Sequence, residues 1–375
     1  MRFPFAALLL LAPILAFSED EPRIKIVKTS KLNIAITGLE GADLDTLRRD
    51  LVNSGYCTVT GPDQAQFTAK GNGGGSLQSV LTERDGKIAL SKSYGGAGRT
   101  AIHRFADDIV ETLAGARGIA STKIAFVGAR TGKKEIYTCD ADGSNLVQLT
   151  HDGAISVSPA LSPDGQSLLY TGYQSGYADV YRIHIPTGAR SRIIKYPGTN
   201  SGAKFSPDGS RIAVTLSKDG NPELYVTGSS GGSPRRLTHT PGVDTSPTWS
   251  PDGSEIIYSS DDGGSPQLHR ISAAGGSPSR LATGFGYNTE PNWSPDGKKV
   301  AFNTRSGGSF AVAILELGSG AVRNVGEGQD PVWGADSRHL IFASGGSLVM
   351  LDAQTGTRIP VVSGAGKISE PTWSR

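Results

Sequence analysis

The sequence predicts an α+β protein, with a small N-terminal α/β domain followed by an all-β propeller of six blades that have four strands each. The main observation is a repeat: Ser-Pro-Asp-Gly begins at residues 162, 206, 250 and 294, always 44 residues after the previous copy. Degenerate copies follow at Gly334 and Ser374. Repeats of about 40–45 residues with one aromatic residue per unit are typical of β-propellers. Before residue 120 this period is absent and apolar residues recur at helical spacing.

Residues 1–18 have the features of a secretory signal peptide. Arg2 precedes the apolar run Phe5–Ala12. The segment ends with Ala16, Phe17 and Ser18, directly before the acidic Glu19, Asp20 and Glu21. The run is shorter than the roughly 20 apolar residues that cross a bilayer. We therefore expect the signal to be removed after Ser18, and we expect no later segment to span a membrane.

Composition limits the classes of partner. The sequence has 37 Lys and Arg, which become 36 without Arg2, against 35 Asp and Glu, so the mature chain is nearly neutral. Near-neutrality argues against nucleic acid as the main partner. Two cysteines do not make a disulfide framework, and we expect Cys57 and Cys139 to be buried free thiols, with one interdomain disulfide as the alternative.

Residues 19–120 are predicted to form the α/β domain. Apolar residues fall on one face over residues 42–53 and 100–114, which predicts two amphipathic helices. Strands are expected at 24–27, 32–37, 57–60, 66–70, 77–82 and 87–93. We interpret Gly71–Gly75 as a hairpin loop, because no Gly-Lys-Ser/Thr follows it as a phosphate-binding loop requires.

Residues 121–375 are predicted to form the propeller. Ser-Pro-Asp-Gly suits a type I turn that joins the first and second strands of a blade. Short β-branched or aromatic runs follow each turn, as at 167–171 and 255–259. Residues 121–127 form a second strand without a first, and residues 370–374 a first strand without a second. The last strand should therefore complete the opening blade and close the ring.

No catalytic, metal-binding or cofactor-binding constellation is apparent. Gly228–Gly232 matches Gly-x-Ser-x-Gly, but Ser230 falls in a predicted hairpin rather than in the strand-to-helix turn that a nucleophile needs. Asp140–Asn145 resembles the start of a calcium loop but lacks its later carboxylates, so we interpret it as a turn. The six histidines lack metal-ligand spacing, and we expect most of them to be surface residues.

The remaining candidate site comes from propeller geometry. The first strand of every blade lines the central channel, so residues at the start of these strands should surround one mouth of it. They are polar and partly acidic, which suits a peptide or protein loop that carries donors or positive charge. The predicted partner-binding residues are Asn200, Ser201, Asp244, Thr245, Asn288, Thr289, Glu290, Asp330 and Glu370.

The chain resembles the TolB family, the periplasmic propeller proteins of the Tol-Pal system. The resemblance lies in Leu51–Gly55 after the first predicted helix, and in Ala106–Gly115 continuing through Gly118 into Lys123–Val127. It implies a monomeric, non-enzymatic periplasmic protein that supports outer-membrane integrity and cell division. In that family the propeller mouth binds the lipoprotein Pal, a contact that some bacteriocins mimic, which would involve Asn200, Ser201 and Thr245 first.

The resemblance also implies that the N-terminal segment contacts a TolA-like inner-membrane protein. That segment contains Glu19, Asp20, Glu21, Arg23, Ile24, Lys25 and Ile26. The acidic start and the shortened, glycine-rich first domain depart from the family pattern. The alternative function is an exported propeller enzyme or an accessory module, associated with a peptidase or acting on carbohydrate.

Overall fold

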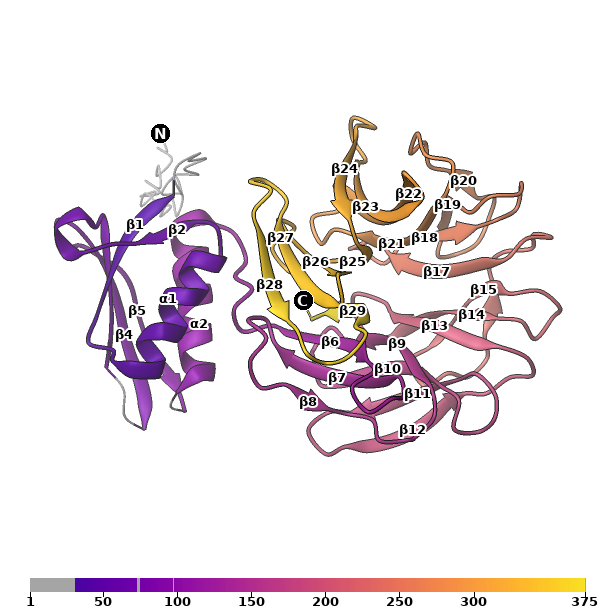
Figure 1. Ribbon diagram of the computed structural model, residues 1–375, viewed down its shortest axis with the longest axis horizontal. Helices are drawn as coiled ribbons and strands as arrows, with labels where there is room; N and C mark the ends of the chain where they lie inside the picture. Colours follow the sequence, from indigo (N-terminus) through magenta and orange to yellow (C-terminus); the bar gives the residue numbers. More distant parts are fainter. Residues whose placement is uncertain (1–30, 73–74, 97, 375) are drawn as a thin grey trace, which may run out of the picture.

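The computed structural model describes residues 31–72, 75–96 and 98–374. The expected signal peptide, the strand at 24–27 and the N-terminal partner segment 19–26 lie outside these ranges. The ribbon separates into a helix-containing domain and a ring of sheets beside it (Figure 1). Within the described ranges, no helix combines the length and the apolar character needed to cross a membrane.

The N-terminal domain is a five-stranded sheet with order β2-β1-β3-β4-β5. Its strands are β1 (Leu32–Thr37), β2 (Cys57–Val59), β3 (Phe67–Asn72), β4 (Ser76–Glu83) and β5 (Ile88–Gly95). The helices α1 (Gly41–Asn53) and α2 (Arg99–Ala114) pack against each other and against this sheet, and a short 3₁₀ helix, η1, covers Pro62–Gln64. Leu47, Leu51, Phe105 and Ile109 are fully buried in the resulting core, as helical spacing predicted.

Six four-stranded antiparallel sheets form the propeller, which confirms the predicted blade number. The inner strands are β9 (Ser156–Leu161), β13 (Asn200–Phe205), β17 (Asp244–Trp249), β21 (Asn288–Trp293), β25 (Gln329–Trp333) and β29 (Ser369–Trp373). The second strands are β6 (Lys123–Gly128), β10 (Ser167–Gly172), β14 (Arg211–Leu216), β18 (Glu255–Ser260), β22 (Lys299–Ser306) and β26 (His339–Ser344).

The third and fourth strands complete each blade toward the rim. The third strands are β7 (Glu135–Asp140), β11 (Asp179–His184), β15 (Glu223–Gly228), β19 (Gln267–Ser272), β23 (Ser309–Glu316) and β27 (Ser347–Asp352). The fourth are β8 (Val147–Gln148), β12 (Ala189–Ile194), β16 (Arg235–Arg236), β20 (Ser279–Arg280), β24 (Val322–Glu327) and β28 (Arg358–Val362). Several fourth strands are two residues long, so the outer edge of those blades is mostly loop.

The ring closes as predicted, because β29 pairs antiparallel with β6 and becomes the inner strand of the blade β29-β6-β7-β8. The four Ser-Pro-Asp-Gly turns have one geometry. In the first, the Ser162 hydroxyl accepts a 2.9 Å hydrogen bond from the Ser167 amide, and Gly165 adopts φ 67°. The same serine-to-amide bond recurs at Ser206, Ser250 and Ser294. The repeat is therefore a turn scaffold.

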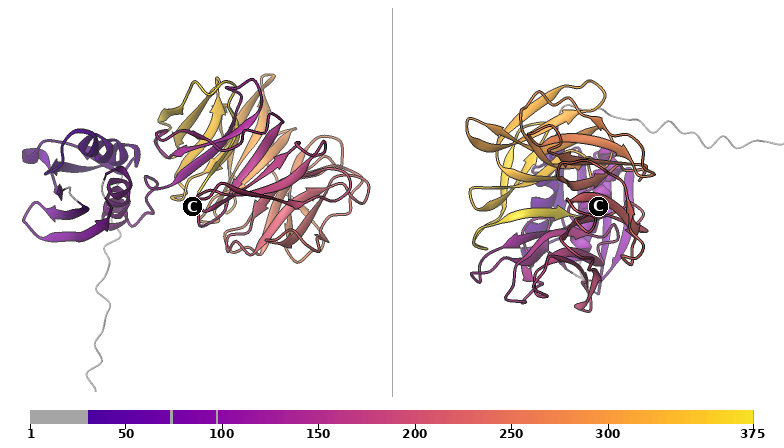
Figure 2. Two further views of the ribbon diagram at one scale, coloured as in Figure 1. Left: turned by 90° about the horizontal axis from the view of Figure 1, so that it is seen from below. Right: turned by 90° about the vertical axis from the view of Figure 1, so that its right-hand side faces the viewer.

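The two domains meet through charged and polar groups. Arg338, which directly precedes β26, donates to the Gly55 carbonyl at 3.1 Å and stacks 4.3 Å from the centre of the Tyr56 ring. Arg338 is itself held by Asp352, with bonds of 3.0 and 2.6 Å. Figure 2 shows the N-terminal domain to one side of the ring. The expected buried free thiols are also present, at Cys57 and Cys139.

Candidate functional site: the central channel

Each of the six inner strands has a bulge at the same position. The ladder register shifts there in every blade. The bulge residues all have positive φ, between 50° and 63°, although only one of them is glycine. They are Ser158, Gly202, Ser246, Glu290, Asp330 and Glu370, which we call the bulge ring. A left-handed non-glycine residue costs about 1–2 kcal/mol, and such strain is often found at functional sites.

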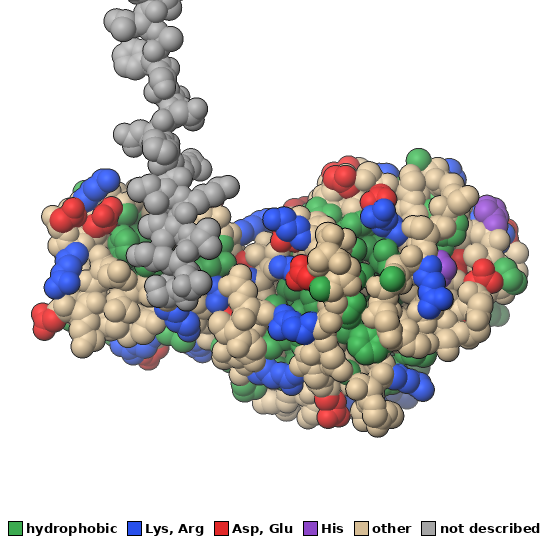
Figure 3. Space-filling view, turned by 90° about the horizontal axis from the view of Figure 1, so that it is seen from above, with side chains coloured by type: hydrophobic (Ala, Val, Ile, Leu, Met, Phe, Trp, Pro, Cys, Tyr) green, Lys and Arg blue, Asp and Glu red, His purple; other side chains and the backbone are tan. Residues whose placement is uncertain are grey.

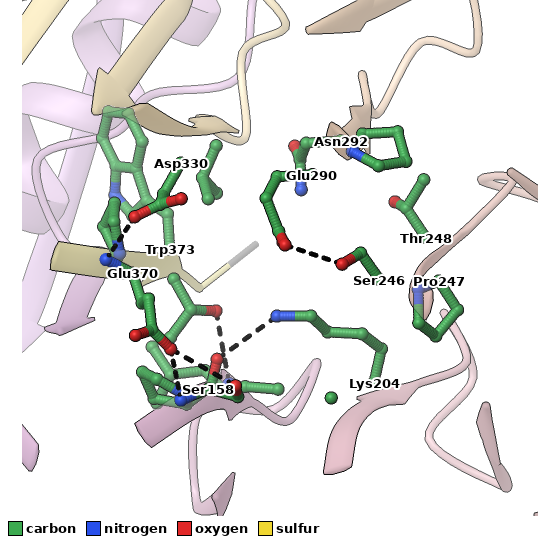
Figure 4. Close-up of a pocket in the computed structure, with 18 of the residues that line it drawn as sticks. Ser158, Lys204, Ser246, Pro247, Thr248, Glu290, Asn292, Asp330, Glu370 and Trp373 are labelled. Atoms are coloured by element: carbon green, nitrogen blue, oxygen red, sulfur yellow. Dashed lines mark hydrogen bonds between the residues drawn. The ribbon is translucent and has the colours of Figure 1, made fainter. Parts of the chain in front are cut away.

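The bulge ring lines a cavity of about 470 Å³ in the channel, within the volume range of ligand sites. Figure 4 shows Ser158, Ser246, Glu290, Asp330 and Glu370 around this space. Hydrogen bonds connect neighbouring blades within the ring. Glu370 accepts from the Ser158 amide at 2.7 Å, and the Glu370 amide donates to Asp330 at 2.9 Å. Ser246 donates to Glu290 at 2.7 Å.

Lysines accompany the carboxylates of the ring, so the channel wall carries charges of both signs. Lys134, Lys204 and Lys367 line the cavity together with Glu290, Asp330 and Glu370. Lys204 points toward the ring (Figure 4), and its ammonium group lies 3.4 Å from the Pro159 carbonyl. Burial lowers the pKa of Lys204, against the opposing effect of the carboxylates of Glu290, Glu370 and Asp330.

Of the three carboxylates in the bulge ring, Glu290 accepts the fewest hydrogen bonds from other protein groups. Its side chain is reached by solvent within the channel, yet protein surrounds it, so its charge is poorly solvated. Burial, followed by repulsion from Asp330, raises the pKa of Glu290 to about 7, although the Ser246 hydroxyl and Lys204 oppose the shift. Because Asp330 and Glu370 accept backbone amides, Glu290 is the ring carboxylate most available to a ligand.

The structure places five of the nine predicted partner-binding residues on the cavity wall, namely Ser201, Thr245, Glu290, Asp330 and Glu370. Asn200, Asp244 and Asn288 are instead fully buried. Asn200 donates to the Tyr196 and Ala178 carbonyls, and Asn288 donates to Gln267 and to the Phe285 carbonyl. These three side chains fasten the loops between blades, so they are not available at the mouth.

Thr289 is half-buried and is not among the residues that line the cavity. Sequence reasoning missed Lys204, Thr248 and Asn292, which do line it. A signal for Lys204 was present, since it lies two residues after the glycine of the ring on a predicted inner strand. The charges on the face seen in Figure 3 are of both signs and interspersed, unlike the one-signed patches that bind nucleic acid.

Replacing Glu290 by Gln is expected to raise the melting temperature at pH 8 and to leave it nearly unchanged at pH 5. The folded-state pKa of about 7 is higher than the ordinary carboxyl value, so between these values the folded protein holds the extra proton. Stability therefore falls as pH rises through 7, and glutamine removes this loss. Thermal unfolding at both pH values checks the result, with Glu316→Gln on an exposed strand end as the control. An equal shift at pH 5 and pH 8 would contradict it.

Known proteins with sequences or structures similar to this chain share its propeller. A family model described as TolB beta propeller domain matches residues 110–375. A TolB homolog of Chlorobaculum tepidum is 42% identical over 137 residues, covering 33% of this chain and 32% of the relative. The Tol-Pal system protein TolB of Desulfosudis oleivorans is 39% identical over 127 residues, covering 33% of this chain and 28% of the relative. The chain thus spans about a third of the length of the curated relatives it matches.

The likeness in three dimensions extends over both domains. The crystal structure of TolB from Acinetobacter baumannii has a TM-score of 0.82 and is 26% identical, with 92% of this chain and 97% of that chain covered. A putative TolB from Agrobacterium tumefaciens, at 20% identity and a TM-score of 0.52, shares the fold. Because the family model covers more than half of the sequence, including every blade, the chain belongs to the TolB β-propeller family.

Proposed function

We propose that this chain is a non-enzymatic, periplasmic scaffold of a Tol-Pal envelope system, exported by its N-terminal signal. Its propeller mouth binds a surface loop of a Pal-like peptidoglycan-associated lipoprotein, and its N-terminal segment binds a TolA-like inner-membrane protein. In this role it supports outer-membrane integrity and cell division. Membership of the TolB family supports the system, and relatives named as Tol-Pal proteins support the partners.

The observation that carries the mouth assignment is the bulge ring. Five non-glycine residues with left-handed backbone surround one cavity, and their side chains offer carboxylates and hydroxyls to its centre. A rigid ring of this kind provides a preformed seat, which lowers the ordering cost of binding a loop. Glu290 is suited to accept a hydrogen bond or a positive charge from that loop, while Lys134 and Lys367 are suited to its acidic or carbonyl groups.

Capture of the cognate Pal-like lipoprotein tests the mouth. The double variant Ser201→Arg and Thr245→Arg fills the cavity wall with two long cationic side chains, so captured lipoprotein should fall at least about tenfold. This corresponds to a loss of about 1.4 kcal/mol or more. The matched control is Ser230→Arg with Ser319→Arg, since both serines are exposed on loops or turns toward the rim.

Both double variants should keep the wild-type melting temperature. Equal capture by the mouth variant and the control would rule out the proposed site. Reduced capture by both would equally contradict it, because binding would then not be localised to the channel.

A further inference from the structure

A second cluster of potential ligands lies where the two domains meet. His103 belongs to α2 of the N-terminal domain, while Asp140 ends β7 and Asp142 lies in the following turn of the propeller. One ligand atom from each of these three residues lies within 4.8 Å of the others. We call them the interdomain triad. Because the set combines two domains, spacing along the chain gave no sign of it, and His103 is buried rather than on the surface as expected for most histidines.

Hydrogen bonding fixes which nitrogen of His103 faces the triad. Nδ1 lies 2.7 Å from a carboxylate oxygen of Asp50, which is itself buried and can only accept while it is ionised. A neutral His103 therefore carries its proton on Nδ1 and has a lone pair on Nε2. Nε2 is buried, has no hydrogen-bond partner among the described residues, and lies 3.9 Å from Oδ2 of Asp140. A cation bound beside the two carboxylates would give this buried lone pair a partner.

From this geometry we propose that the interdomain triad is a binding site for a divalent transition-metal ion of the zinc class. Imidazole nitrogens and carboxylate oxygens both serve as ligands of such ions. A metal-bound histidine usually donates its other ring N–H to a carboxylate, and Nδ1 of His103 has Asp50 in this position. Zinc bonds of about 2.0–2.2 Å at a tetrahedral angle would place two ligand atoms about 3.4 Å apart. The 3.9 Å separation of Nε2 and Oδ2 is close to this.

Basic side chains also contact the carboxylates of the triad, and they would compete with a metal ion for these carboxylates. Arg99 and Lys123 contact the carboxylates of Asp142 and Asp140, and Arg49 lies 3.5 Å from Asp142. With Asp50, the three carboxylates and three basic side chains already balance, so a bound dication leaves an excess of positive charge. The side chains of Arg49 and Lys123 are 43% and 52% exposed and can turn into solvent. Removing either basic group should therefore strengthen metal binding.

Zn²⁺ titration of the untagged full chain by calorimetry tests the site. We expect one Zn²⁺ per chain at the triad, with weaker binding of Ca²⁺, which prefers six to eight oxygen ligands. Asp142→Asn and His103→Gln should each weaken this binding at least about tenfold. Lys123→Gln and Arg49→Gln should strengthen it several-fold. His184→Gln, an exposed histidine elsewhere in the propeller, is the matched control and should leave the triad's affinity unchanged.

Thermal unfolding gives an independent measurement, because an ion that binds only the folded state raises the melting temperature. Zn²⁺ should raise it in the wild type and in Lys123→Gln but not in Asp142→Asn. Asp142 lies in a turn, so its variant keeps the test valid if His103→Gln fails to fold. The proposal is overturned if Zn²⁺ binds no better to the wild type than to Asp142→Asn, or if the basic-residue variants bind it no more tightly.

Discussion

Removing residues 370–375 is expected to lower the melting temperature by roughly 10 °C or more, the larger of two stability effects that we predict. Loss of a buried tryptophan alone costs about 3–5 kcal/mol, and in a domain of this size each kcal/mol shifts the melting temperature by about 2–4 °C. Trp373 is buried against the cores of β6 and β26 and donates to the Thr122 hydroxyl at 2.7 Å. The truncation also leaves β6 as an exposed edge, which favours aggregation.

Differential scanning calorimetry of the truncated chain measures this effect, and Trp373→Phe is its control. Phenylalanine keeps most of the buried apolar surface but loses the bond to Thr122, so the expected loss is about 1 kcal/mol. An unchanged melting temperature in the truncated chain would mean that the last strand does not hold the ring closed. A loss in Trp373→Phe as large as in the truncation would assign the effect to one hydrogen bond.

The propeller could be predicted from the sequence because its turns have a strict chemical requirement. Serine accepts an amide, proline fixes φ, and Gly165 and its equivalents adopt positive φ, so these residues recur at a constant interval. The unpaired runs at 121–127 and 370–374 likewise predicted β29 beside β6.

The mouth was only partly predictable because the bulge is not visible in a sequence. In a regular strand alternate residues face the same side, but a bulge inserts one residue and re-aims those around it. Asn200 therefore bonds to the neighbouring blade and Asp244 accepts from Thr240 in the loop before its strand, while Ser246 and Glu290 line the channel. Non-glycine residues with positive φ give no compositional sign of this. His103 was missed for another reason, since the two carboxylates beside its Nε2, Asp140 and Asp142, lie in the other domain.

The second large stability effect is expected at Arg338, where Arg338→Met should destabilise the protein by about 3–5 kcal/mol at pH 7. Arg338 and Asp352 form a buried ion pair with two hydrogen bonds, and removing the arginine leaves a buried carboxylate without its partner. Methionine preserves length and apolar contact with Tyr56. The bond to the Gly55 carbonyl is also lost, so the interface between the domains weakens together with blade stability.

The pH dependence of this effect identifies its origin. Burial opposes the charge of Asp352, but the hydrogen bonds from Arg338 and the Gln354 amide outweigh it and hold the pKa of Asp352 well below its usual range. A depressed carboxyl pKa adds stability above the unfolded value of about 3.9, and this contribution is lost as pH falls toward the folded value. The gap in melting temperature between wild type and Arg338→Met should therefore be largest near pH 7 and shrink below about pH 4.

Arg323→Met is the control, because Arg323 is exposed and its guanidinium donates to the Ala353 carbonyl. A gap that stays constant down to pH 3 would show that lost packing, not the ion pair, explains the destabilisation.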